Sequence, residues 1–406
     1  MPQFIPLNFY SYSWSNPALK PEQVIAPPYD VLSAPARQNL AKQSPYNAVH
    51  IDLPESYDQA ANILTAWKAE RIISKTNDPH FYILATDYTV DGKTHTRWGI
   101  LGGLRLTPFG QGQVFPHEQT YPKAKADRLK LMRATGGQLS PIFGIYDDPE
   151  LTLTKIGSEL QNSVPIVDFV QEENIRHRLW LVPKKENEKI ASLLENQKIY
   201  IADGHHRYET ALKFQQEQGP GTIEDPKPWD YVFTYLSNIS SPGLEIFPYH
   251  RMLSWEKMYS WQEILKIAEK NYSIQKVDHQ DSLDNITNPA GCILYIPGSY
   301  YLLQPKGESK NTFDQIGAHV LDKYFLRQTL GLTEQELSSG SFLSYTPFAS
   351  EAITKVDQGN IQAAFLLKPV SMSILQTVCQ SGQVMPRKST YFYPKLPTGL
   401  LFYLWH

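Results

Sequence analysis

The residues with the clearest capacity for chemistry lie in one short segment, Asp203 to Arg207, which reads DGHHR. The apolar residues Tyr200 to Ala202 end a predicted strand, Lys198 to Ala202, and helical periodicity resumes at Tyr208, so a strand, a turn and a helix are predicted here. Unpaired N–H groups and the dipole at a helix N-terminus attract phosphate, and a glycine lets the backbone approach closely. An arginine can grip phosphate oxygens, and histidines can exchange protons near neutral pH. The predicted phosphate or nucleotide ligands are Gly204, His205, His206 and Arg207.

Each of these residues also has a purely structural explanation. Asp203 could simply cap the helix, Gly204 could form the turn, and Arg207 could be a surface charge. Together they are harder to attribute to folding alone, because buried polar groups cost free energy unless they are paired. Zinc binding is a weaker alternative, since adjacent histidines point apart on a helix and no HExxH motif or suitably spaced third ligand occurs.

Composition and charge restrict the class of protein. A chain of 406 residues with a formal net charge of -3 has no global field that would attract nucleic acid. The most basic segment, Lys123 to Arg133, has the spacing of a solvated helix face. The chain has two cysteines, Cys292 and Cys379, and they suggest neither a disulfide framework nor a zinc cage. No signal peptide or membrane span is evident, so we expect a cytoplasmic protein that has no membrane partner and does not bind nucleic acid.

The order of predicted elements indicates a mixed α/β protein with three regions. Residues 1–110 are predicted to form an α+β region, 111–254 the phosphate-binding core, and 255–406 a second mixed α/β region. Two strands joined across Asp91-Gly92 are expected to form a hairpin in the first region. His250-Arg251 follows a predicted strand and is expected at the surface.

Four segments together resemble a widely distributed cytoplasmic family that was long without an assigned function. They cover nearly the whole chain, and the third and fourth are the most specific. They are Ala26 to Asp30 (APPYD), Pro116 to Thr120 (PHEQT) followed by Ala126 to Leu129 (ADRL), Ala202 to Ala211 (ADGHHRYETA), and Met385 to Lys395 (MPRKSTYFYPK).

The order of the HE pair, a helix, a strand and DGHHR also resembles the ParB/sulfiredoxin-like fold, which includes free serine kinases. The resemblance implies that His205, His206 and Arg207 bind nucleotide phosphates. It implies that Glu118 is the base that accepts the proton of a substrate hydroxyl, and that Asp203 orients the hydroxyl or binds Mg²⁺. His206 is a further catalytic candidate, and Lys388 in the C-terminal motif is a candidate phosphate contact.

The resulting hypothesis is a phosphotransferase that uses ATP, ADP or pyrophosphate, with Mg²⁺, to phosphorylate a small hydroxyl acceptor, for which free L-serine is the best candidate. This chain has tens of extra residues between Glu118 and Asp203 and a large C-terminal region, so the acceptor is the least determined part. Two alternatives stay open: a ParB-like nucleotide-dependent switch or DNA-binding protein, and a nuclease. One fold hosts many activities, so the resemblance sets an expectation only.

Overall fold

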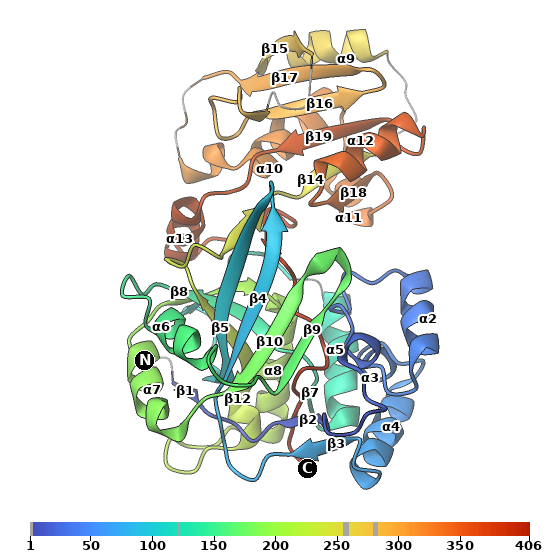
Figure 1. Ribbon diagram of the computed structural model, residues 1–406. Helices are drawn as coiled ribbons and strands as arrows, with labels where there is room; N and C mark the ends of the chain where they lie inside the picture. The colour runs from blue at the N-terminus through green and yellow to red at the C-terminus, as the bar shows by residue number, and fades with distance from the viewer. Residues whose placement is uncertain (1–2, 121, 255–259, 279–282, 308, 310) are drawn as a thin grey trace. The chain divides into compact units, whose positions relative to one another are not determined.

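A mixed sheet forms the centre of the first of two compact units (Figure 1). The computed structural model describes residues 3–120, 122–254, 260–278, 283–307, 309 and 311–406. Within these residues the strand order is β6-β11-β8-β12-β5-β4-β10-β9, with β1 beside β5. The strands are β1 (Phe4–Ile5), β4 (Tyr82–Val90), β5 (Lys93–Arg105), β6 (Val114–Phe115), β8 (Ile142–Tyr146), β9 (Val167–Val170), β10 (Arg176–Leu181), β11 (Ile199–Asp203) and β12 (Tyr231–Asn238).

Strand β11 occupies an interior position in this sheet. It pairs in parallel with β6 and antiparallel with β8, and Ile199 to Ala202 are buried. A continuous apolar run is what a strand covered on both faces requires. The run therefore fixes the point at which Asp203 leaves the sheet.

The helices of the first unit include α5 and α8, which pack against each other, and α4, which contacts α5. The face of α5 that carries Leu131 and Met132 is buried. The helices are α1 (Pro21–Val24), α2 (Ala34–Gln43), α3 (Val49–Asp52), α4 (Tyr57–Ala69), α5 (Pro122–Thr135), α6 (Thr152–Leu160), α7 (Asn187–Glu195) and α8 (His205–Gln218).

The C-terminal segment Pro394–His406 belongs to the first unit, together with 1–116 and 120–244. Ala26 and Thr398 exchange backbone hydrogen bonds of 3.0 and 2.8 Å. Strand β21 (Tyr403–Leu404) pairs with β7 (Gly137–Gln138), and β2 (Tyr10–Tyr12) pairs with β3 (Ile73–Lys75). The end of the chain is thus tied to its beginning by backbone pairing.

The second unit consists of 117–119 and 245–393. Its described residues form an antiparallel sheet in the order β15-β17-β16-β19-β14-β18, and β13 (Glu245–Phe247) pairs separately with β20 (Tyr391–Tyr393). The six strands are β14 (His250–Leu253), β15 (Tyr272–Val277), β16 (Cys292–Ile296), β17 (Ser299–Pro305), β18 (Leu343–Thr346) and β19 (Ala363–Leu367). The helices are α9 (Trp261–Ala268), α10 (Gly317–Val320), a π-helix (Leu321–Thr329), α11 (Glu334–Ser339), α12 (Ala349–Asp357) and α13 (Met372–Gln380).

The predicted mixed α/β class is confirmed. The predicted hairpin is also present, since β4 and β5 pair in antiparallel. Asp91 and Gly92, which join them, both have positive φ, as a tight turn requires. The division into three regions stays a prediction, and residues 255–259 at its second boundary lie outside the described residues. None of the helices within the described ranges has the length and apolarity needed to cross a membrane.

Two predictions about exposure are wrong. His250 and Arg251, expected at the surface, are buried in β14, because β18 and β19 pair with that strand on both sides. Arg128 is buried as well, although its segment has the charge pattern of a solvated helix face. The two arginines keep their charge inside the protein by contacting acidic residues.

Candidate functional site

The DGHHR segment forms the predicted strand, turn and helix. Asp203 is the last residue of β11, and Gly204 precedes α8 in the left-handed conformation, with φ 87°. A Cβ atom at Gly204 would lie 3.0 Å from Nε and 3.1 Å from Nη2 of Arg207. Glycine is needed here both for the backbone conformation and because the arginine side chain lies over the turn. Gly204 has no side chain to cap α8, so the helix N-terminus is left to other hydrogen-bond acceptors.

Asp203 is held by two cations from different parts of the chain. Nζ of Lys395 donates to Oδ1 at 2.9 Å, and Nη2 of Arg207 donates to Oδ2 at 2.8 Å. Burial would raise the pKa of Asp203, but Lys395 and Arg207 outweigh it and hold the pKa well below its usual range. Asp203 is therefore ionised at neutral pH, and the three side chains together carry one net positive charge beside the N-terminus of α8.

Most of the Arg207 guanidinium is already bonded within the protein. Nη1 donates to Oγ of Ser140 at 3.1 Å and to the carbonyl oxygen of Pro141, while Nη2 donates to Asp203. Nε has no hydrogen-bond partner among the described residues. Arg207 is thus fixed against the two residues that precede β8, and a bidentate grip on phosphate would require it to release at least one of these bonds.

The two histidines differ in their surroundings. His205 is buried, and its charge would act on Asp203. Burial lowers the pKa of His206, although Glu209 and Asp30 act in the opposite direction. His206 is therefore mainly neutral at pH 7 and can accept a proton. Tyr29 of the APPYD segment lines a pocket together with Arg207, so this segment lies near the DGHHR turn.

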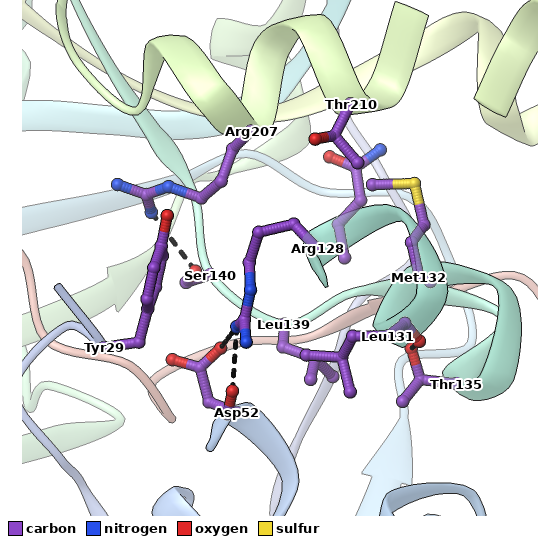
Figure 2. Close-up of a pocket in the computed structure, with 12 residues that line it drawn as sticks. Tyr29, Asp52, Arg128, Leu131, Met132, Thr135, Leu139, Ser140, Arg207 and Thr210 are labelled. Carbon is purple, nitrogen blue, oxygen red and sulfur yellow. Dashed lines mark hydrogen bonds and ion pairs between the residues drawn. The ribbon is translucent and has the colours of Figure 1, made fainter. Parts of the chain in front are cut away.

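A pocket opens next to Arg207 in the first unit (Figure 2). The space between its lining residues is open to solvent on one side and amounts to about 420 Å³ with that solvent included. The ring of Tyr29 stands between Arg207 and Arg128, and the Arg128 guanidinium carbon lies 4.3 Å from the centre of that ring. The lining residues are Tyr29, Asp52, Arg128, Leu131, Met132, Thr135, Gly137, Gln138, Leu139, Ser140, Arg207 and Thr210.

Arg128 joins the pocket to a buried carboxylate. Its Nη1 donates to the backbone oxygen of Asp52 at 2.8 Å and to Oδ1 at 3.2 Å, and its Nη2 lies 2.7 Å from Asp127. Burial raises the pKa of Asp52, and Arg128 partly offsets the rise. Asp52 and Arg128 were not predicted as site residues. For Arg128 the sequence did contain a signal, because its helical spacing places it on the same face of the helix as Leu131 and Thr135.

Glu118 and Lys388 belong to the second unit, and the structure brings these two predicted residues together. The backbone N–H of Lys388, which has a positive φ of 57°, donates to Oε1 of Glu118 at 3.0 Å. Nζ of Lys388 lies 3.3 Å from the hydroxyl of Tyr249. Beside Glu118, Nε2 of His117 is 2.8 Å from Oγ1 of Thr390. The phosphate contact predicted for Lys388 stays a prediction, whereas Lys395 of the same motif is the lysine paired with Asp203.

The residues do not form a ready-made Mg²⁺ site. Among the described residues there is no group of three His, Cys, Asp or Glu side chains placed to hold a metal ion. Both carboxylate oxygens of Asp203 already accept from cations. Mg²⁺ often binds through substrate phosphates and water with few protein ligands, so an ion that arrives with a nucleotide would not need such a group.

Residues 9–324 of the chain match one family model, described as protein of unknown function (DUF1015). The match covers more than half of the chain. The chain belongs to the DUF1015 family. No curated protein matches this DUF1015 chain.

Several solved structures are similar to this DUF1015 protein. A free serine kinase in complex with AMP is 13% identical, with a TM-score of 0.37, over 71% of this chain and 89% of that one. A conserved hypothetical protein from Pyrococcus furiosus is 12% identical, with a TM-score of 0.36, over 70% and 90%. SbnI with a C-terminal truncation, from Staphylococcus aureus, is 12% identical, with a TM-score of 0.36, over 71% and 82%. Identities and scores this low establish no shared function.

Proposed function

We propose that this protein transfers a phosphoryl group from a nucleotide to a small hydroxyl acceptor, with phosphate bound at the N-terminus of α8. The observation that carries the proposal is the arrangement of Lys395, Asp203 and Arg207 around the Gly204 turn. One net positive charge, a helix N-terminus and a glycine that lets a ligand approach the backbone suit a phosphate group. ATP, ADP and pyrophosphate are the proposed donors, and free L-serine is the proposed acceptor.

In the proposed reaction the acceptor hydroxyl oxygen bonds to the terminal phosphorus, and the bond from that phosphorus to the leaving phosphate oxygen breaks. Glu118 is proposed to take the hydroxyl proton, an assignment that rests on the resemblance of the sequence. The depressed pKa of Asp203 makes it a poor proton acceptor at neutral pH, so we assign it an orienting and electrostatic role. His206, mainly neutral at pH 7, is a second proposed proton acceptor.

The donor set limits the proposed role of Mg²⁺. When bound, the ion would neutralise charge on the transferred phosphate. Asp203, the proposed metal ligand, could bind the ion only after Lys395 or Arg207 has moved away from its carboxylate. We therefore propose that Mg²⁺ enters with the nucleotide rather than at a site formed beforehand by the protein.

The test is a Mg²⁺-containing assay of the full chain with ATP, ADP or pyrophosphate and L-serine, in which O-phosphoserine is followed by mass spectrometry. Arg207→Ala should weaken nucleotide binding, while Glu118→Gln should preserve binding and abolish turnover. Arg133→Ala, on the exposed side of α5, is the matched control and should change neither. Product formation that is unaffected by both site variants would refute the assignment.

The alternatives predict different results in the same experiments. A ParB-like switch would bind nucleotide without forming product and would show DNA affinity that falls with salt. A nuclease would cleave nucleic acid without needing an acceptor. The net charge of -3 and the absence of a global basic field favour neither alternative.

A further inference from the structure

The pocket beside Arg207 contains buried polar groups that the protein itself does not satisfy. Nε of Arg207 and Oγ1 of Thr210 have no hydrogen-bond partner among the described residues. Thr210 is only 1% exposed, and both side chains line the pocket. A buried polar group without a partner carries a free-energy cost, which a bound ligand that supplies the missing partner would remove.

Tyr29 adds a third hydrogen-bonding group to the same pocket. Figure 2 shows its hydroxyl on the side of Arg207. Burial, partly offset by Arg207, raises the pKa of Tyr29 to about 12, so the hydroxyl keeps its proton at neutral pH. The hydroxyls of Tyr29 and Thr210 can donate, and the Arg207 Nε–H can only donate. A ligand atom that bonds to any one of these donors must therefore be an acceptor.

We propose that this pocket binds the carboxylate of a small molecule of amino-acid size, with Arg207, Thr210 and Tyr29 as its hydrogen-bond donors. The positive charge of Arg207 favours an anionic oxygen over a neutral one. Leu131, Met132 and Leu139 form an apolar wall that suits a short carbon frame. The proposal rests on the proposed function, because it makes the pocket the acceptor subsite of the phosphoryl transfer.

The pocket wall also carries a negative charge, which can pair with a positively charged group on the ligand. Asp52, a buried carboxylate on the pocket wall, is 3.2 Å from Arg128 at Oδ1 and 3.3 Å from the Thr398 hydroxyl at Oδ2. A carboxylate can accept further hydrogen bonds beyond these two. An ammonium group on the ligand would donate to Asp52. We therefore expect the ligand to be an α-amino acid, whose carboxylate pairs with Arg207 and whose ammonium pairs with Asp52.

The experiment uses calorimetric titration of the full chain with L-serine, D-glycerate and ethanolamine, each with and without ADP. Ethanolamine has the amine and the hydroxyl of serine but no carboxylate. Thr210→Val removes the unpartnered hydroxyl at nearly constant volume, and Tyr29→Phe removes the phenolic hydroxyl. Thr65→Val is the control, because Thr65 on α4 is not among the lining residues and donates its hydroxyl to the Ala61 carbonyl oxygen at 2.9 Å.

L-serine and D-glycerate should bind and ethanolamine should not. Thr210→Val and Tyr29→Phe should each raise the Kd of L-serine roughly tenfold or more, as expected for loss of a hydrogen bond to a charged group. The Kd of ADP should be unchanged in both variants, and Thr65→Val should leave the Kd of L-serine and the Kd of ADP unchanged. Two independent variants keep the test decisive if one of them fails to fold.

The outcomes separate this proposal from the proposed function. ADP binding without binding of either carboxylate would overturn the pocket assignment and leave the nucleotide site standing. Equal binding of ethanolamine and L-serine, or no effect of either variant, would also overturn it. Binding of L-serine through Thr210 and Tyr29 without any nucleotide binding would support the pocket and overturn the phosphoryl transfer.

Discussion

Lys395 donates from Nζ to Oδ1 of Asp203 at 2.9 Å, although 192 positions separate the two residues. The contact ties the end of the chain to the turn before α8. Arg207 donates to the other carboxylate oxygen, so each oxygen of Asp203 accepts from one cation and the three side chains keep one net positive charge.

Replacing Lys395 by Met should weaken both folding and phosphate binding. The Lys395 side chain is 8% exposed and that of Asp203 is 20% exposed, so solvent replaces the lost partner poorly. We expect a loss of about 1 to 3 kcal/mol in unfolding free energy, measured by chemical denaturation, and weaker binding of ADP. Lys184→Met is the control, because its pair with Asp78 is 60% and 56% exposed, and little change is expected there. Equal effects of the two substitutions would contradict the prediction.

Gly204→Ala should disturb the site by two separable effects. The positive φ penalises any L side chain by about 1 kcal/mol or more. The new Cβ would also press on Nε and Nη2 of Arg207, at 3.0 and 3.1 Å. Gly92→Ala is the control, since Gly92 has φ 73° but a Cβ atom added there would meet nothing within 4 Å. Both variants should lose stability, but only Gly204→Ala should weaken ADP binding, measured by calorimetry.

His177 should make the protein sensitive to mild acid. Burial, together with the charge of Arg97, lowers the pKa of His177 to about 3, whereas an unfolded histidine has a pKa of about 6.5. Below about pH 6.5 His177 binds a proton in the unfolded chain but not in the folded chain. The free energy of unfolding therefore falls as the pH decreases from about 6.5 toward 3. Between pH 7 and pH 5 the contribution lost is about 2 kcal/mol.

The measurement compares denaturant unfolding of the natural chain and His177→Gln at both pH values. The variant should lose about 2 kcal/mol less than the natural chain over that interval, because glutamine does not titrate. Other buried histidines, His250 among them, titrate in both proteins and cancel in the difference. Parallel losses in the two proteins would show that His177 is not the sensitive group.

Arg251→Met should destabilise the second unit and loosen Glu118. Arg251 is 1% exposed, lies 3.9 Å from Asp322, and donates from Nη1 to the carbonyl oxygens of Tyr249 and Lys388 at 2.7 and 3.1 Å. Losing one partner of a buried pair costs roughly 3 kcal/mol. Because the Lys388 N–H holds Glu118, turnover should fall more than nucleotide affinity. Arg176→Met is the control, because Arg176 belongs to a half-exposed pair with Asp168. Full turnover in Arg251→Met would show that Arg251 does not position Glu118.

The candidate site divides into a local part that was predictable and a distant part that was not. Asp203 to Arg207 follow a buried apolar run, and strand, turn and helix were predicted from that pattern alone. The sequence alone could not show which lysine of the C-terminal motif contacts the DGHHR segment, since Lys388 and Lys395 lie in one short motif. In the structure they belong to different units, because backbone pairing returns the chain to the first unit from Pro394 onward.

The sequence by itself determined the elements, because helix and strand periodicity, glycine turns and caps act over a few residues. It determined that a candidate phosphate-binding segment lies between Ala202 and Tyr208. Only the tertiary structure decided that Tyr29, Arg128 and Lys395 surround that segment, because charge and burial depend on which distant residues the sheet brings together. The burial of Arg128 and Arg251 has the same cause, since a charged side chain can be buried once the fold supplies its partner.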